Sequence, residues 1–294
     1  MRKCVPLTFL NICLLVASYG ADTEILVHKT VSEVQLAVVA TDRSGHPVSN
    51  LSSGELSVVE DGRPVPSFDL RSASDLPLRV GIVLDLSGSM RKAWPTVRTA
   101  LSRSLPQFVR PQDQLLILAF DHKIEVEETI SRPQQVALVD MPQPGGLTAL
   151  YDTLCVASRE AWFANTGEPR RSALILFSDG EDNLSRHDLE EAIASVQAAG
   201  IAVYSISQHS HKRPLEGDAV LRELSAASGG RSFVAADGVE LQRALRAIEG
   251  ELRSSYLLYY RTPEGAARFR RVRLVPTHAD GLELRSRAGY YTSK

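Results

Sequence analysis

The feature that most constrains the fold is a regular alternation of short apolar runs and longer, helix-like segments through the middle of the chain. The short runs are bounded by polar turns, which predicts buried strands. They are Leu78–Leu84, Leu115–Phe120, Ala173–Phe177, Ile201–Ile206 and Ser232–Val234. The segments between them repeat apolar residues every three or four positions, which predicts helices. These are Trp94–Phe108, Thr148–Phe163, His187–Ala199, Asp218–Ser228 and Val239–Leu252.

This alternation determines how the strands can be connected. Parallel strands joined through helices use right-handed crossovers, which place helices on the faces of the sheet. We therefore expect a doubly wound, Rossmann-like α/β fold with a mostly parallel sheet and helices on both faces, over residues 76–252.

The two ends of the chain have a β pattern instead. Residues 21–75 contain the alternating run Val34–Val39 and the run Leu56–Glu60, and residues 253–294 contain further apolar runs such as Tyr256–Tyr260. We expect these end segments to pack together as a smaller β-rich domain beside the α/β domain. Four arginines, which surround one predicted strand, could form a solvated strand face or a binding patch, and the solvated face is the simpler interpretation. They are Arg268, Arg270, Arg271 and Arg273.

Residues 1–20 have the pattern of a secretory signal peptide. A basic start, Met1–Lys3, precedes a mostly apolar run, and Ser18–Gly20 offers small residues for cleavage. A retained anchor is the alternative, although the run is short for a membrane span. No second run of eighteen apolar residues follows, so we expect no stable transmembrane segment after cleavage. The predicted location is secreted, or periplasmic and associated with the cell envelope.

Composition excludes some classes of function. The 294 residues include 33 basic and 35 acidic side chains, a net charge of −2, which argues against nucleic acid as a partner. Two of the three cysteines lie in the signal peptide, which leaves Cys155 alone in the mature chain. A single cysteine builds no internal disulfide framework, and Cys155 is expected to be a buried, inert thiol.

Polar residues gather where three predicted elements meet one edge of the sheet. Asp85, Ser87 and Ser89 follow the first strand of the α/β region, Thr148 opens a helix, and Asp179 follows the strand that ends at 177. In doubly wound sheets, ligands bind at the carboxyl ends of the strands, so these side chains can share one ligand. Every group offers oxygen and none offers sulfur or imidazole, which favours a hard cation such as Mg²⁺, with Mn²⁺ or Ca²⁺ as alternatives.

These motifs resemble the metal-ion-dependent adhesion site (MIDAS) of von Willebrand factor A domains. The resemblance rests on the Asp-x-Ser-x-Ser of 85–89, the Gly-x-Thr that ends at Thr148 and the Asp-Gly at Asp179, and it covers roughly residues 77–252. It implies that Ser87, Ser89 and Thr148 contact the metal, and that Asp85 and Asp179 balance its charge, often through water. It also implies a metal-dependent protein-binding module, rather than an enzyme, that captures an Asp or Glu of a partner protein.

The flanking segments resemble secreted proteins of the acidobacterial von Willebrand factor A related type. The similar stretches are DRSGHPVSNLSSGELSVVEDGRPV, SSYLLYYRTPEG and LELRSRAGYYT. In one respect the chain departs from integrin-type members of the family, whose second metal site uses acidic residues after the second serine. Met90, Arg91 and Lys92 stand there instead, so that second site is not expected.

Three alternatives compete with the adhesion site. Asp85, Ser87 and Ser89 could simply cap a helix, with Asp179 in a turn. A metal-assisted hydrolase acting outside the cytoplasm is the alternative function; it would need a general base near the metal, and Glu181 and Asp182 are the candidates. His209 and His211 could form half of a zinc site. A serine hydrolase is disfavoured because the serines lack the Gly-x-Ser-x-Gly frame.

Overall fold

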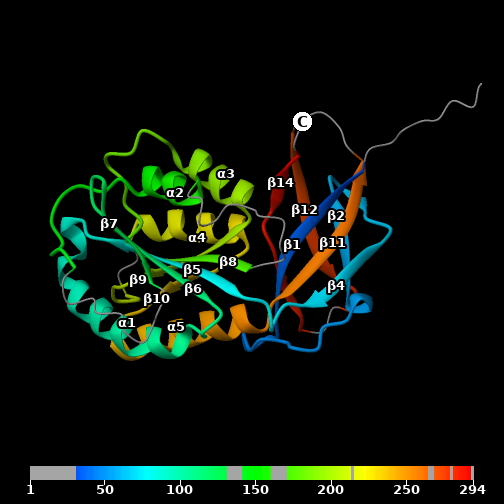
Figure 1. Cartoon of the computed structure of the whole chain (residues 1–294), viewed down its shortest axis with the longest axis horizontal. Coiled ribbons are helices and arrows are strands. Elements are labelled where there is room, and N and C mark those ends of the chain that lie inside the picture. The colour runs from blue at the N-terminus through cyan, green and yellow to red at the C-terminus, as the bar shows by residue number, and fades with distance from the viewer. Residues whose placement is uncertain are drawn as a thin grey trace, which may run out of the picture.

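A computed structural model of the 294-residue chain describes residues 31–130, 141–159, 171–212, 215–263, 268–278 and 281–292. The expected signal peptide, residues 1–20, lies outside the described residues. Figure 1 shows two units side by side. We call the part from strand β5 to helix α5 the α/β unit, and the strands from the two ends of the chain the β unit.

The α/β unit is built on a six-stranded sheet in the order β10-β9-β8-β5-β6-β7. Its strands are β5 (Leu78–Asp85), β6 (Gln114–Phe120), β7 (Ile124–Ile130), β8 (Arg171–Phe177), β9 (Ile201–Ser207) and β10 (Ser232–Val234). Neighbouring strands are parallel except β6 and β7, which form an antiparallel hairpin at one edge. From β5 the chain moves outward through β6 to one edge, then returns to β8 on the other side of β5. The order of the strands therefore reverses between β5 and β8, where such sheets bind ligands.

Helices cover both faces of this sheet (Figure 1). On one face lie α1 (Trp94–Phe108) and α5 (Gly238–Arg253); on the other lie α2 (Leu150–Arg159), α3 (Leu189–Ala199) and α4 (Gly217–Ser228). Because side chains alternate along a strand, Ile82 enters the core under α1 and α5, whereas Val83 enters the core under the other three helices. This arrangement confirms the predicted fold class. Among the helices that the structure describes, none has both the length and the apolar character needed to cross a membrane.

The β unit contains two four-stranded sheets, ordered β13-β1-β11-β4 and β14-β12-β2-β3. Its elements are β1 (Val31–Thr41), the short 3₁₀ helix η1 (Ser53–Glu55), β2 (Leu56–Glu60), β3 (Arg63–Pro64), β4 (Phe68–Ser72), β11 (Tyr256–Pro263), β12 (Phe269–Pro276), β13 (Glu283–Arg285) and β14 (Gly289–Tyr291). Strand β1 pairs with β11 and strand β2 with β12, both antiparallel, so the two ends of the chain share both sheets. One apolar core, which includes Leu36, Val58 and Leu258, joins the sheets face to face.

Three elements differ from the sequence-based expectations. Strand β7 was not predicted, because its Glu125, Glu127 and Glu128 are exposed and give no apolar pattern. An edge strand in a hairpin needs only backbone pairing with its neighbour, which sequence periodicity does not report. Helix α2 begins at Leu150 rather than at Thr148. Helix α3 begins after His187, at Leu189, because Asp188 caps it by accepting a hydrogen bond from the Glu191 amide at 2.9 Å.

The arginines around β12 do not form one solvated face. Arg268, Arg271 and Arg273 are exposed, but Arg270 is buried inside the β unit. Its guanidinium lies 2.7 Å from the Glu60 carboxylate. Successive side chains of a strand point to opposite faces, so Arg270 has to point inward when its neighbours point outward. The expectation of a solvated face is therefore wrong for Arg270, whose charge is matched by Glu60.

Cys155 is a free, buried cysteine in α2, as expected. Burial raises the pKa of its thiol, because the thiolate is disfavoured away from water. The side chain therefore acts as a small apolar group in the core.

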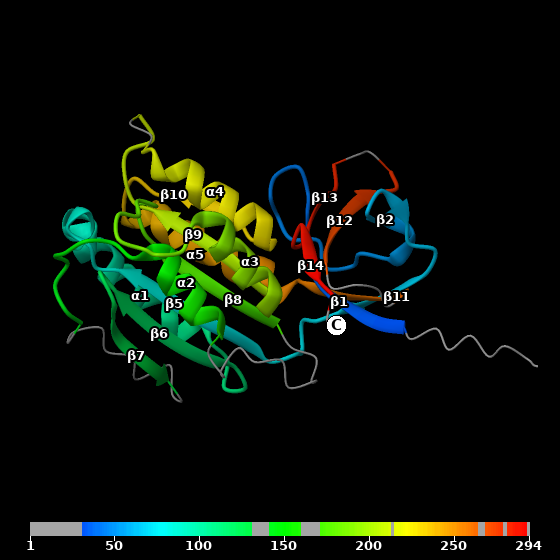
Figure 2. The same cartoon turned by 90° about the horizontal axis from the view of Figure 1, so that it is seen from above.

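The two units also make direct contacts. The Arg287 guanidinium donates a hydrogen bond to the Gln197 carbonyl in α3 at 2.7 Å and another to the Gln35 carbonyl in β1 at 3.0 Å. The Ala288 amide donates to the carbonyl of Ala227 in α4 at 2.9 Å. Figure 2 shows the same boundary from above, with α3 and α4 next to β13 and β14. The units are thus linked by more than the connecting chain.

Candidate metal centre

The five predicted site residues lie on three loops at the carboxyl edge of the sheet. Asp85 is the last residue of β5 and is followed by Ser87 and by Ser89 in the 3₁₀ helix η2 (Gly88–Lys92). Thr148 lies in the loop before α2, and Asp179 lies just after β8. Strands β5 and β8 are neighbours, so the loops of Asp85 and Asp179 leave the sheet side by side at the point where the strand order reverses.

Backbone hydrogen bonds join the first loop to the second. The Gly145 amide donates to the Leu86 carbonyl at 2.7 Å, and the Gly88 amide donates to the Gly146 carbonyl at 3.1 Å. These bonds place the loop that carries Ser87 and Ser89 against the loop that ends at Thr148. Main-chain hydrogen bonds therefore hold the loop of Ser87 and Ser89 next to the loop of Thr148, independently of the family resemblance of their motifs.

Gly146 is needed for this approach. Its φ is +130°, a conformation that residues with a Cβ rarely adopt. A Cβ at this position would also lie 2.7 Å from a carboxylate oxygen of Asp121, the residue that follows β6. The carbonyl of Asp121 accepts the Ala149 amide at 2.8 Å, so the second loop is held on both sides of Thr148.

A second set of bonds joins the Thr148 loop to the loop after β8. The Thr148 amide donates to the side-chain oxygen of Asn183 at 2.9 Å. In return, the Thr148 carbonyl accepts the amides of Asn183 and Leu184, both at 3.1 Å. The loop that begins at Asp179 is thus held against Thr148 through Asn183 and Leu184.

Ser178 links the first loop to the third by hydrogen bonds. It is fully buried, and its hydroxyl donates to the Asp85 carboxylate at 2.7 Å while accepting the Gly180 amide at 3.0 Å. Ser178 was not among the predicted site residues, although it stands directly before Asp179 at the end of an apolar strand. That position was the available signal, since a polar residue at a strand end on this edge faces the ligand site.

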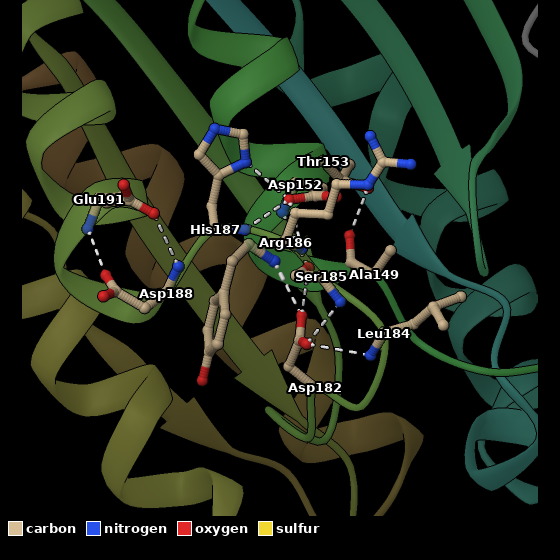
Figure 3. A network of polar contacts seen from close by, with 11 residues as sticks. Ala149, Asp152, Thr153, Asp182, Leu184, Ser185, Arg186, His187, Asp188 and Glu191 are labelled. Carbon is tan, nitrogen blue, oxygen red and sulfur yellow. Dashed lines mark hydrogen bonds and ion pairs between the residues drawn. The ribbon is translucent and has the colours of Figure 1, made fainter.

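Two carboxylates fasten the same loop to α2 (Figure 3). Asp182 accepts hydrogen bonds from the amides of Tyr151, Leu184 and Ser185 and from the Ser185 hydroxyl, at 3.0, 3.3, 3.0 and 2.6 Å. Asp152 accepts the amides of Arg186 and His187, each at 3.0 Å. Both oxygens of Asp182 are therefore occupied by the start of α2 and by its own loop, which leaves it poorly suited to act as a general base.

The first loop holds its oxygens in one group. The hydroxyls of Ser87 and Ser89 lie 3.0 Å apart, and the Ser87 amide donates to the Asp85 carboxylate at 2.8 Å. Ser87 and Thr148 are each 2% exposed, whereas Ser89 is exposed. The group therefore lies at the surface edge of a mostly buried site, open to solvent on the side of Ser89.

Electrostatics at this edge favour a cation. Asp85 and Asp179 are only 1% and 8% exposed, and no ion pair from any described residue reaches either carboxylate. Burial raises the pKa of Asp85 to about 6, and the nearby negative charge of Asp179 acts in the same direction. Two buried like charges are costly unless a positive charge compensates them. An oxygen-only set of two carboxylates and three hydroxyls fits a hard divalent cation.

Two other groups of side chains carry metal-ligating atoms. Asp121, His122 and Glu125 offer ligand atoms within 4.8 Å of one another, but His122, in the β6–β7 turn, and Glu125, on β7, are both exposed. The histidines of the alternative half zinc site contact separate carboxylates, His209 with Asp218 at 3.0 Å and His211 with Glu240 at 2.8 Å. Neither group combines the burial and uncompensated charge of the Asp85–Asp179 edge.

Solved structures similar to this chain share little sequence with it. Proximal thread matrix protein 1 from the mussel byssus is 13% identical, with a TM-score of 0.48, over 71% of this chain and 51% of that one. The chain thus spans about half the length of the mussel protein, which has also been solved with zinc in its MIDAS motif. An aerotolerance-related membrane protein from Bacteroides fragilis is 17% identical over 60% of this chain and 98% of that one, with a TM-score of 0.45.

Comparison with curated proteins by sequence gave no match. The model of the von Willebrand factor type A domain, however, matches residues 80–247, which is more than half of the chain. The matched range begins within β5, ends within α5 and includes all three loops described above. The chain therefore belongs to the von Willebrand factor type A domain family.

Proposed function

We propose that this chain is a metal-dependent protein-binding module for adhesion or assembly. In this proposal Ser87, Ser89 and Thr148 bind a divalent cation, Mg²⁺ before Mn²⁺ or Ca²⁺, and Asp85 and Asp179 balance its charge. The observation that carries the proposal is the pair of buried carboxylates beside hydroxyl oxygens, with no cationic partner among the described residues. Oxygen ligands in this number suit Mg²⁺, which commonly keeps several waters.

The choice of ligands explains how such a site would bind a protein. Hydroxyl ligands carry no charge, so they do not neutralise the positive charge of a cation as directly bound carboxylates would. When bound, the cation supplies a coordination position that an Asp or Glu of a partner protein can fill. Ser89 is exposed, which leaves this side of the site accessible to a partner.

Two exposed leucines extend the proposed binding surface beyond the metal. Leu147 is 52% exposed and Leu184 is 44% exposed, and both are large apolar side chains. Leu147 precedes Thr148 in sequence, and the amide of Leu184 bonds to the Thr148 carbonyl. Apolar side chains beside a polar anchor commonly contribute to protein interfaces. We assign them contact with apolar residues that flank the acidic residue of the partner.

The proposal includes no catalytic step. A hydrolase would need a general base near the metal-bound water. Of the two candidates, Asp182 already accepts four hydrogen bonds, whereas Glu181 is exposed and is tested by substitution. Turnover assays with phosphoesters and peptides in Mg²⁺ test this directly. Metal-dependent turnover that is lost in Asp182→Asn or in Glu181→Gln, with metal binding retained, would favour the hydrolase instead.

The first experiment measures metal binding. Calorimetric titration of the purified chain with Mg²⁺, Mn²⁺ or Ca²⁺ should give one site, and Ser87→Ala and Asp85→Asn should each weaken it at least tenfold. Asp69→Asn is the matched control, because Asp69 is an exposed residue on β4 of the β unit whose carboxylate pairs with Arg71. Unchanged affinity in both site variants would refute the assigned ligand set.

The second experiment measures partner capture. The tagged chain is incubated with cell-envelope and secreted fractions in Mg²⁺ or in EDTA, because the expected signal peptide exports the protein. Partners retained in Mg²⁺ should be released by EDTA and absent with Ser87→Ala. Replacing acidic residues of an identified partner with their amides should remove binding. Capture that survives both EDTA and Ser87→Ala would contradict the proposal.

A further inference from the structure

A cavity of about 460 Å³ lies at the boundary between the two units. Its lining residues come from α4, β10 and the turn between them in the α/β unit, and from β12, β13 and Ser286 in the β unit. This volume falls in the range of small-molecule binding sites in proteins. The cavity is separate from the metal edge, since none of the five predicted metal-site residues lines it.

Positive side chains dominate this cavity. Arg222 comes from α4, Arg231 precedes β10, Arg273 lies on β12 and Arg285 on β13. Among the described residues of the lining, Asp218 is the acidic one. Its two oxygens already lie 3.0 Å from the His209 ring nitrogen and 2.9 Å from the Leu215 amide, which donates to it. The lining of this cavity therefore carries four guanidinium groups and one carboxylate.

Two of the arginines are held in place by a single carboxylate. Glu251, whose side chain is fully buried, lies 3.1 Å from the Arg231 guanidinium and 2.6 Å from that of Arg285. Arg285 also donates to the Gly230 carbonyl at 3.1 Å, and Arg231 lies over the Phe233 ring at 4.3 Å from its centre. One negative charge shared between two guanidiniums leaves this wall with a net positive charge.

The other two arginines are available to a ligand. Arg222 and Arg273 are exposed, and within the part of the chain that the structure describes neither side chain makes a hydrogen bond or ion pair. The lining also includes half-buried apolar residues from both units, Val234, Leu274 and Leu284, of which the two leucines also pack on the core of the β unit. The cavity thus combines guanidinium groups with an apolar wall.

We propose that this cavity binds a small organic anion that carries a carboxylate or phosphate group on an apolar body. Guanidinium groups match the planar geometry of such oxyanions and bind them with charge-assisted hydrogen bonds. The apolar body packs against the leucine and valine side chains and leaves water. Because α4 and β12 both contribute arginine, a bound ligand bridges the α/β unit and the β unit.

The test is calorimetric titration of the full chain in EDTA with four probes: phenyl phosphate, benzoate, inorganic phosphate and benzyl alcohol. Phenyl phosphate or benzoate should bind at least tenfold more tightly than both inorganic phosphate, which lacks the apolar body, and benzyl alcohol, which lacks the charge. The double variant Arg222→Gln, Arg273→Gln should lose at least tenfold of that affinity. Arg103→Gln, at an exposed arginine on α1, is the matched control and should bind as the wild type does.

Neither exposed arginine makes a hydrogen bond or ion pair within the described residues, so replacing both removes no such contact from the fold. The double variant should therefore unfold at the same temperature as the wild type, which a thermal scan measures. Equal affinity for all four probes, or undiminished affinity of a folded double variant, would overturn the proposal. Comparable binding of benzoate and phenyl phosphate supports a general organic anion site. Binding of phenyl phosphate alone assigns the site to phosphate-bearing ligands.

Discussion

The hydroxyl of Ser178 donates a hydrogen bond of 2.7 Å to the carboxylate of Asp85, joining the ends of two neighbouring parallel strands. Both side chains are buried. The bond therefore holds Asp85, a candidate metal-site residue, in position and stabilises the negative charge of its buried carboxylate.

Ser178→Ala should destabilise the chain by about 2 kcal/mol, because hydrogen bonds to buried charged groups contribute on this order. The Gly180 amide would also lose its acceptor. Urea unfolding in EDTA measures the change, with the exposed Ser102→Ala on α1 as the control. A variant as stable as the wild type would show that Asp85 is held by other contacts.

Asp179→Asn should make the metal-free chain more stable and the metal-bound chain less so. Removing one of two buried like charges relieves repulsion with Asp85, but it also removes the charge that attracts a cation. With Mg²⁺ at one hundred times its dissociation constant, the wild type should gain about 2.7 kcal/mol. Thermal unfolding in EDTA and in Mg²⁺ measures both effects, with Asp69→Asn as the control. An equal gain from Mg²⁺ in the variant would exclude Asp179 from the site.

Gly146→Ala should destabilise the chain by about 1–3 kcal/mol and weaken metal binding, because an alanine is strained at this φ and its Cβ would press on Asp121. Gly54→Ala is the control, since a Cβ there meets nothing within 4 Å. That variant should keep or slightly increase its stability. Chemical unfolding and metal titration of both variants separate the local strain from a general effect of added volume. Equal behaviour of the two variants would refute this role of Gly146.

Leu147→Gln and Leu184→Gln should weaken binding of a captured partner several-fold and leave metal affinity unchanged, because they remove apolar contact area without touching the ligands. Val156→Gln is the matched control, as Val156 is 40% exposed on α2. Surface-immobilised partner and metal titration give the two affinities. Loss of metal affinity together with partner affinity would show that the leucines support the site itself.

Glu60→Gln should lower stability at pH 7 by about 3 kcal/mol, because it leaves Arg270 buried without its counter-charge. Burial tends to raise the pKa of Glu60, but hydrogen bonds from Tyr260, Tyr290 and Arg270 outweigh it and hold the pKa below its usual 4.5. A lowered folded-state pKa adds stability that is present above about pH 4.5 and is lost as the pH falls through the folded value.

The wild type should therefore lose stability more steeply below pH 4.5 than Glu60→Gln does. Unfolding between pH 2 and 7 measures the two slopes. Glu128→Gln, on the exposed face of β7, should follow the wild-type curve. Parallel curves for Glu60→Gln and the wild type would rule out this linkage.

Several features were readable from sequence because their physical cause is local. Ile82 and Val83 alternate between the two faces of a buried strand, and the apolar spacing of Trp94 and Val97 follows one face of a helix. Such periodicity depends only on backbone geometry and on which side chains leave water. The order of Asp85, Thr148 and Asp179 along the chain then suggested one shared edge, because parallel strands direct their carboxyl ends the same way.

The tertiary structure alone decided the features that depend on long-range pairing. The sequence around Ser178 does not say that its hydroxyl meets Asp85, and Arg270 resembles its exposed neighbours until β12 pairs with β2 beside Glu60. The cavity likewise joins Arg222 to Arg273 across the boundary between the two units. Local pattern sets which residues are buried, whereas the partner of each buried polar group is set by strand order and by the packing of segments distant in the chain.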